Sequence, residues 1–228
     1  MIKKSKKATI DDGCNPELVA GAKFDGIMKI PVIEKPSRII IPSGITPFSK
    51  IKYQPDLTEA IGFYENDILF ADVLKDPEKY ISTFRKYAAI ISLDCSLYRN
   101  ASPAVQVTNI YRSRAIGSYY QRRGVYVIPQ IRWGNELTYT TKYFPEKVAF
   151  LGVAKHSIVA IGTYGCIKSK EDKYYFKSGL EEMLLELEPE IVLVYGPMPP
   201  SVFNDYINYT RFIQYEDWIS RKHNKEVI

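Results

Sequence analysis

The chain has 228 residues, of which 46% are hydrophobic and 25% charged, a balance typical of soluble globular proteins. No apolar run reaches the roughly 18 residues that cross a bilayer, so we expect no membrane partner. The net charge of +5 suits an anionic partner such as a nucleotide or nucleic acid, but it is also common in proteins that have none.

The three cysteines, Cys14, Cys95 and Cys166, are odd in number and lie far apart in the chain. This pattern argues against a disulfide framework and favours a reducing compartment. The first residues, MIKKSKKATIDDG, are basic but lack the apolar core of a secretory signal. We therefore expect a cytoplasmic protein.

Residues 1–55 are predicted to form an irregular, basic N-terminal extension that packs on the body of the protein. After the basic tip, short apolar runs are interrupted by Pro and Gly in FDGIMKIPVIEKPSRIIIPSGITPF. This composition indicates a flexible tip followed by an extended segment over the main body. Residues 56–228 are then expected to form a single α/β domain.

From residue 58, short apolar runs alternate with amphipathic stretches. An Asp followed by Pro, and later a Ser followed by Pro, are residue types that commonly begin a helix. In the second of these stretches, apolar or aromatic residues recur every fourth position from Val107 to Tyr119, which places them on one side of a helix. We expect strands over 60–64, 88–96 and 125–133, and helices over 76–87 and 102–124.

The second half of the chain continues the alternation. A strongly amphipathic stretch ends at Pro189, because proline cannot continue a helix. We expect a helix over 171–189 between strands at 157–165 and 190–196, then a short helix at 201–208 and a last strand at 211–216.

Strands that alternate with helices imply parallel strands joined by right-handed crossovers. The runs AAIISL and IVLVY are apolar throughout, as expected for strands covered on both faces. The predicted fold is therefore α/β, with a mostly parallel sheet of about six strands. A doubly wound sheet is the first expectation and an incomplete barrel is the second.

In both architectures, ligands bind at the carboxyl ends of the parallel strands. Polar loops would give polar residues at any single one of these positions, but their density over the whole set favours a site. The candidates that follow successive strands are Glu65; Asp94, Ser96, Tyr98 and Arg99; Arg132 and Trp133; and Thr163 and Gly165.

Asp94 follows a run of apolar positions, so its carboxylate is expected at the edge of the sheet. It is a candidate general base, metal ligand or arginine partner, and the alternative is a cap for backbone N–H groups before Pro103. With Glu65, it would form a carboxylate pair suited to metal-assisted or acid/base hydrolysis. A divalent cation is thus a candidate cofactor, whereas the Cys and His spacing of a zinc site is absent.

Four arginines belong to elements around one crossover: Arg99, Arg112, Arg114 and Arg132. On a helix, Arg112 and Arg114 flank the apolar stripe instead of pointing straight out. Guanidinium groups in such places need acceptors, which are either carboxylates such as Asp94 and Glu136 or a bound anion. The sequence leaves both alternatives open.

The loop TYGC, residues 163–166, precedes a predicted helix, and its backbone N–H groups are suited to phosphate. Neither the dinucleotide fingerprint nor the P-loop is present. No histidine stands in a recognisable relation to Cys166, so we expect an inert thiol. The stretch YYQRRGVY mixes rings with cations, as single-strand nucleic-acid surfaces do, although the helical spacing of most tyrosines is typical of packing.

The segments ISLDCSLYRN, NIYRSRAIGSYYQRRGVYVIPQIRWG, SIVAIGTYGC and LEPEIVLVYG resemble a bacterial and phage family catalogued as domain of unknown function 4417. That family typically reads D-F-S-L-Y-R, then Y-R-x-R, V-I-P-x-x-R-W and a strand ending in Y-G. The resemblance covers about residues 55–200, with Cys95 where the family usually has Phe. It implies a home in Firmicute-type bacteria, their mobile elements or phages, without an established activity. The matching motif positions are Asp94, Ser96, Tyr98, Arg112, Arg114, Arg132 and Trp133.

Three functions remain open at this point. The first is an enzyme-like domain that binds a phosphate-bearing ligand, nucleotide or nucleic acid, at the strand ends. In it, Asp94 acts as base or metal ligand, Trp133 stacks on a ring, and the anion is held by Arg112, Arg114 and Arg132. The second is a non-catalytic DNA- or protein-binding module of a mobile element, and the third is a hydrolase of a neutral substrate that uses Glu65 and Asp94.

Overall fold

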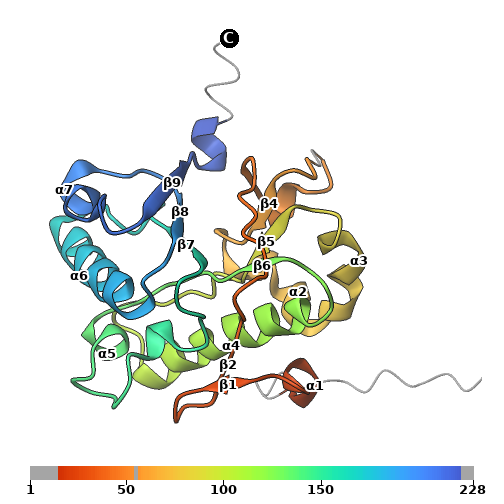
Figure 1. Ribbon diagram of the computed structural model, residues 1–228, viewed down its shortest axis with the longest axis horizontal. Helices are drawn as coiled ribbons and strands as arrows, with labels where there is room; N and C mark the ends of the chain where they lie inside the picture. Colours follow the sequence, from red (N-terminus) through yellow and green to blue (C-terminus); the bar gives the residue numbers. More distant parts are fainter. Residues whose placement is uncertain (1–14, 54–55, 222–228) are drawn as a thin grey trace, which may run out of the picture.

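The computed structural model describes residues 15–53 and 56–221, so the basic tip and Cys14 lie outside the described residues. Its centre consists of seven short parallel strands in two ladders (Figure 1). The first ladder has the order β3 (Ile45–Pro47), β4 (Ala60–Gly62), β5 (Ala89–Ile91) and β6 (Val127–Ile128). The second has the order β7 (Ile158–Gly162), β8 (Ile191–Tyr195) and β9 (Arg211–Tyr215).

The two ladders are joined just beyond the end of β6. Gln130 forms a parallel bridge with Ala160 of β7, and the backbone N–H of Ile131 donates to the carbonyl of Ala160 at 2.8 Å. The strands therefore follow one another in sequence order from β3 to β9. A doubly wound sheet reverses its order at one point, and this chain does not. The predicted α/β class is confirmed, and the strand order is that of an incomplete barrel.

The pattern of burial agrees with a barrel. Successive residues of a strand face opposite sides, so Ile158 and Ala160 face one core and Val159 and Ile161 another. The core that contains Ile158 receives apolar side chains from all seven strands, which is the expected interior of a small barrel. The other two large cores lie between the strands and the surrounding helices.

No backbone ladder joins β9 to β3 within the described ranges, so the barrel stays open there. Side chains span the gap instead. The hydroxyl of Tyr215 donates to the carbonyl of Pro42 at 2.6 Å, and Arg221 Nη1 pairs with Glu59 Oε1 at 2.8 Å. The first and last strands are thereby kept close without shared backbone hydrogen bonds.

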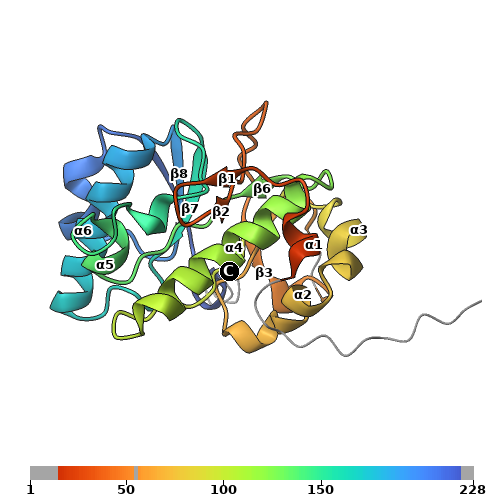
Figure 2. The ribbon, with the colours of Figure 1, turned by 90° about the horizontal axis from the view of Figure 1, so that it is seen from below.

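The helices surround the strands, and the two long ones carry most of the packing (Figures 1 and 2). The first, α4 (Pro103–Gln121), runs across the molecule below the first ladder, and α6 (Lys170–Leu187) covers the second. Ser169 and Asp172 form a capping box that fixes the first turn of α6. The shorter helices are α1 (Pro16–Val19), α2 (Ala71–Lys75), α3 (Ile81–Phe84), α5 (Glu136–Tyr139) and α7 (Pro200–Phe203).

Two elements differ from the sequence-based expectation. The predicted helix over 76–87 is a 3₁₀ turn at Pro77–Tyr80 followed by α3, since the Asp76 side chain makes no capping bond. The strand β3 lies inside the predicted N-terminal extension, so the sheet begins before residue 55. Pro47 fits an edge strand, where a backbone N–H can be absent. Because the surrounding segment is rich in proline, the sequence did not indicate a strand there.

The described part of the extension also contains α1 and a small antiparallel pair, β1 (Phe24–Asp25) with β2 (Ile30–Pro31). Both α1 and β2 pack against α4. The backbone N–H of Gly152 donates to Asp25 at 3.0 Å and fixes the pair to the body. Among the described residues, no helix is long and apolar enough to cross a membrane.

Candidate functional site

A cavity of about 630 Å³ lies beside the carboxyl ends of β5, β6 and β7. The loops after these strands form part of its wall, and the first turns of α6 form the rest. Its most distinctive side chains are four aromatic rings and two arginines: Tyr98, Trp133, Tyr175, Phe176, Arg99 and Arg132. The predicted location at the strand ends thus coincides with this cavity.

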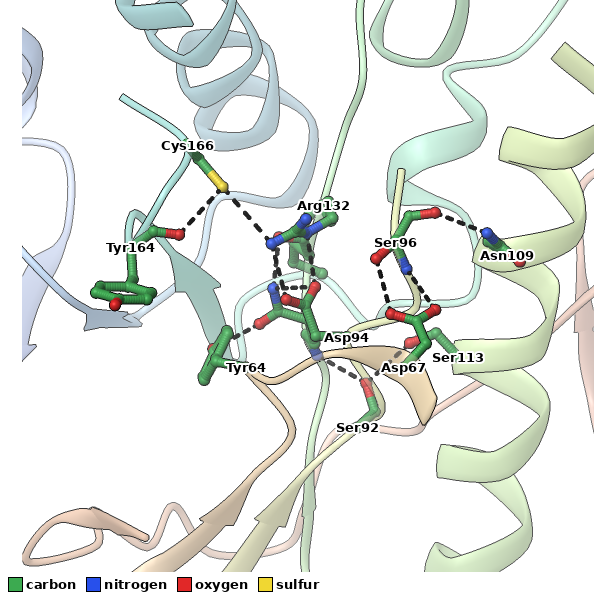
Figure 3. A network of polar contacts seen from close by, with 12 residues as sticks. Tyr64, Asp67, Ser92, Asp94, Ser96, Asn109, Ser113, Arg132, Tyr164 and Cys166 are labelled. Carbon is green, nitrogen blue, oxygen red and sulfur yellow. Dashed lines mark hydrogen bonds and ion pairs between the residues drawn. The ribbon is translucent and has the colours of Figure 1, made fainter. Parts of the chain in front are cut away.

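Arg132 presents a fixed guanidinium group at the wall of this cavity. Its Nε lies 2.6 Å from Oδ1 of Asp94, and its Nη2 donates to Oδ2 at 2.8 Å (Figure 3). The Asp94 side chain is 6% exposed, whereas that of Arg132 is 24% exposed. This bidentate pair occupies one edge of the guanidinium, and within the described residues Nη1 has no hydrogen-bond partner.

The protonation of this pair follows from its burial. Burial alone would lower the pKa of Arg132, but the Asp94 carboxylate raises it above its ordinary value. Burial raises the pKa of Asp94, while Arg132 and Gln130 act in the opposite direction. Arg132 therefore stays cationic at neutral pH, and the carboxylate that accompanies it is removed from water.

A chain of hydrogen bonds from Tyr64 through Gln130 fixes the position of the Asp94 carboxylate. The hydroxyl of Tyr64 donates to Gln130 Oε1 at 2.6 Å, which directs Gln130 Nε2 to donate to Asp94 Oδ1 at 3.2 Å (Figure 3). The backbone N–H of Gln130 donates to Ser92 Oγ at 2.8 Å. Asp94 does not line the large cavity, so its geometry is that of a group that orients Arg132.

Arg99 connects the loop after β5 to the first turn of α6. Its Nη2 donates to Asp172 Oδ1 at 3.0 Å, its Nη1 lies 3.3 Å from Glu171 Oε1, and its guanidinium lies 4.9 Å from the ring centre of Tyr175. The Nη1 atom is buried, and its contact with Glu171 is an ion pair without a hydrogen bond. Two carboxylates therefore neutralise this second cation, and one of its donors remains unused.

Cys166 also contacts the guanidinium group of Arg132. The Nη2 atom of Arg132 lies 3.6 Å from Sγ, which in turn lies 3.6 Å from the carbonyl oxygen of Tyr164. Burial raises the pKa of the thiol, although Arg132 opposes the effect. The neighbouring Gly165 has φ of +77°, a backbone conformation that favours glycine. Both residues line the cavity.

Trp133 forms a wall of the cavity but has little freedom to stack on a ligand. It is buried, its Nε1 donates to the carbonyl of Tyr175 at 3.2 Å, and its ring packs near Phe150 and Phe176. The indole also lies directly against Gly179 of α6, where a Cβ atom would overlap it. The stacking role predicted for Trp133 is not supported by this placement.

We expect Gly179→Ala to displace Trp133 and to lower the free energy of unfolding by about 1–3 kcal/mol, the usual cost of overpacking. The gain in helix propensity, roughly 1 kcal/mol, works in the opposite direction and is outweighed. In a Trp218→Phe background, a shift in tryptophan fluorescence would report the movement. Leu185→Ala, on the exposed side of the same helix, is the control, and an unshifted spectrum would contradict the close contact.

Three predicted site residues serve local structure instead of the cavity wall. Ser96 donates through N and Oγ to Asp67, and Thr163 Oγ1 donates to the carbonyl of Pro197 at 2.8 Å. Glu65 accepts hydrogen bonds from the backbone N–H and hydroxyl of Ser49. The structure therefore offers no support for Glu65 and Asp94 as a carboxylate pair facing a substrate, because neither lines the cavity.

The three arginines that were predicted to hold one anion lie in different places in the structure. Arg114 is 2% exposed and donates to backbone carbonyls, so no anion in the cavity can reach it. Arg112 lines a separate small cavity between α1, α2 and α4. Asp94 pairs with neither of them. Only Arg132 of the three lies at the cavity, because helix α4 turns the other two away.

The α6 side of the cavity was not predicted. Glu171, Asp172, Tyr175 and Phe176 line it, yet the sequence shows them only as part of an amphipathic helix. The capping box at Ser169 was a usable signal, because it marks the helix start that faces the loops. The described residues contain no group of three or more His, Cys, Asp or Glu side chains arranged to hold a metal ion.

Comparison with known proteins adds a family and two relatives. A family model described as Domain of unknown function (DUF4417) matches residues 22–216. The chain is 32% identical to the Gene 1 protein of Mycobacterium phage L5 over 139 residues, which are 61% of this chain and 58% of that protein. It is 33% identical to the Gene 1 protein of Mycobacterium phage D29 over 137 residues, 60% of this chain and 48% of that protein. The matching region thus spans about half of each relative, and no solved structure matches.

Proposed function

The chain belongs to the family described as Domain of unknown function (DUF4417) and is related to phage proteins, and for this member we propose that the cavity binds a phosphate-bearing ligand of the nucleotide class. The observation that carries the proposal is the free edge of Arg132. Asp94 holds the guanidinium in one orientation through Nε and Nη2, which leaves Nη1 without a hydrogen-bond partner among the described residues, and Arg132 lines the cavity. A guanidinium oriented in advance loses little entropy when it binds a phosphate oxygen.

The size and lining of the cavity favour a ligand that also carries a ring. Cavities that bind small molecules usually measure about 300–1,000 Å³ and have mainly apolar walls with few polar groups. Here, Leu97, Ile131 and Phe176 supply apolar surface, and the exposed ring of Tyr98 is available for stacking. The exposed side-chain amide of Asn100 also borders the cavity and is suited to the polar edge of a base.

The charges around the cavity indicate how such a ligand would be recognised. Arg132 is balanced by Asp94, and Arg99 is balanced by Glu171 and Asp172. Directional hydrogen bonds, not a large positive field, would therefore select the phosphate. We accordingly expect the affinity for a mononucleotide to depend only weakly on salt, since few free cations release counterions on binding.

Binding is better supported than hydrolysis. A general base must come within hydrogen-bond reach of the substrate, and Asp94 uses its oxygens on Arg132 and Gln130 behind the cavity wall. The acidic side chains that do line the wall, among the described residues, both pair with Arg99. We assign Asp94 the role of a positioning residue for Arg132.

Calorimetric titration with nucleoside mono-, di- and triphosphates tests the proposal. Arg132→Gln removes the cation but keeps an amide, and we expect it to weaken binding at least about tenfold, the equivalent of roughly 1.4 kcal/mol. Lys86→Gln, at an exposed position away from the cavity, is the control with unchanged affinity. If none of the nucleotides binds the folded wild-type protein, the proposal is wrong.

A further inference from the structure

We propose that the nucleotide in the cavity is one unit of a single-stranded nucleic acid, whose neighbouring base stacks on the exposed ring of Tyr164. This inference rests on the proposed nucleotide site and adds the class of its ligand. Two features of the described residues carry it: the exposed tyrosine rings on the loops after β5 and β7, and two exposed lysines without ion pairs that follow Tyr164 in the chain.

The first feature is the exposure of the rings. Tyr98 is 67% exposed at the cavity wall, and Tyr164 is 48% exposed on the loop after β7. Tyr164 lies on the Cys166 side of Arg132, and Ser96 lies on the opposite side (Figure 3). One exposed ring is therefore available at the cavity wall, and another lies on the loop that carries Cys166, whose thiol contacts Arg132.

Nearby tyrosines show what a packing role looks like in this fold. The rings of Tyr64 and Tyr195 stack at a centroid distance of 4.6 Å and an interplanar angle of 7°. Their hydroxyls also have partners, since Tyr64 donates to Gln130 and Tyr195 accepts from the backbone N–H of Trp218. The exposed ring of Tyr164 lacks such a stacking partner within the described ranges, and this leaves its faces available to a base.

The second feature is a pair of exposed lysines near the start of α6. Lys168 follows Tyr164 in the loop that enters α6, Lys170 is the first residue of α6, and both are exposed. Neither forms an ion pair in the part of the chain that the structure describes, unlike Arg99 and Arg132. A mononucleotide in the cavity does not need these charges, whereas a strand that extends along the loop would bring further phosphates towards them.

The strand would have to be single. Stacking of a base on a tyrosine needs an unpaired base, and a cavity of this kind accepts a base only after it has left the helical stack. A loop that places exposed rings and lysines side by side is the combination that single-strand surfaces use. Duplex DNA offers phosphates to the lysines but no free base to Tyr164.

Fluorescence anisotropy with a labelled oligothymidylate of about 12 nucleotides, its duplex, and thymidine monophosphate as competitor tests the inference. We expect the single strand to bind at least about tenfold more tightly than the monophosphate or the duplex. Tyr164→Ala should weaken binding of the single strand by about five- to 150-fold, the usual range for one stacked base. Tyr164→Phe keeps the ring and should retain the affinity, and the monophosphate should bind both variants as it binds the wild type.

Salt dependence supplies a second measurement. Lys168→Gln with Lys170→Gln should reduce the slope of log affinity against log salt by about one to two for the single strand. Equal affinities of single strand and monophosphate, with no effect of Tyr164→Ala, would overturn the inference and leave the nucleotide site intact. Binding of the single strand that is unaffected by Arg132→Gln would also overturn it. Failure of both ligands to bind would instead remove the proposed function itself.

Discussion

Arg114→Met is expected to lower the free energy of unfolding by about 3–5 kcal/mol, because it leaves buried backbone carbonyls without donors. Arg114 is 2% exposed, and its Nη1 donates to the carbonyl of Gln130 at 2.6 Å. Its Nε and Nη2 donate to Leu151 and Ala149, each at 3.1 Å. One side chain thus joins the end of β6 to the segment before β7, and methionine would fill its space without any of these bonds.

Urea denaturation followed by circular dichroism measures the effect. Lys86→Met places the same new side chain at an exposed position, where a change within about 0.5 kcal/mol is expected. Arg114→Lys keeps the charge, but a compact ammonium group cannot reach the three carbonyls that the planar guanidinium group reaches. Its loss of unfolding free energy should therefore approach that of Arg114→Met. A loss below about 1 kcal/mol for Arg114→Met would show that water or nearby donors replace the guanidinium.

The same geometry explains why Arg114 cannot be an anion ligand. Burial lowers its pKa to about 10, and no carboxylate pairs with it among the described residues. Its charge is stabilised by carbonyl dipoles that point at it from three sides. An arginine inside a helix of this sequence is therefore a structural clamp, although the pattern of residues alone was equally consistent with an anion site.

Asp94→Asn is the second substitution with a large expected effect. It removes the charge that balances Arg132 while keeping the shape of the side chain. Loss of one partner from a buried pair costs about 3–5 kcal/mol, and we expect about 2–3 kcal/mol here because Arg132 is one-quarter exposed and partly hydrated. Nucleotide affinity should also fall, since the freed guanidinium no longer holds one orientation.

Thermal or urea denaturation of Asp94→Asn gives the stability, and titration gives the affinity. Asp205→Asn breaks the exposed pair with Lys177 and is the matched control, with an expected change below about 1 kcal/mol. If Asp94 acts through Arg132, the effects of Asp94→Asn and Arg132→Gln on affinity will not add in the double variant. Unchanged stability with complete loss of binding would instead make Asp94 a direct ligand contact.

Elements that depend on neighbouring residues were predicted from the sequence, whereas features that depend on contacts between distant segments were not. Helices α4 and α6 were predicted to within three residues at each end, because their spacing of apolar residues and their caps are local signals. The strand β3 was missed because it pairs with β4 through contacts that no local pattern contains. The choice between a doubly wound sheet and an incomplete barrel likewise depended on the bridge between Gln130 and Ala160.

By itself, the sequence determined the alternation of strands and helices, their parallel arrangement and the edge of the sheet where polar residues gather. These features follow from the spacing of apolar side chains, which can be read from a few consecutive residues. Only the tertiary structure decided that Asp94 pairs with Arg132 and not with Arg112 or Arg114, and that α6 completes the cavity. The physical reason is that burial and ion pairing depend on which distant segments come into contact. Local sequence patterns do not contain that information.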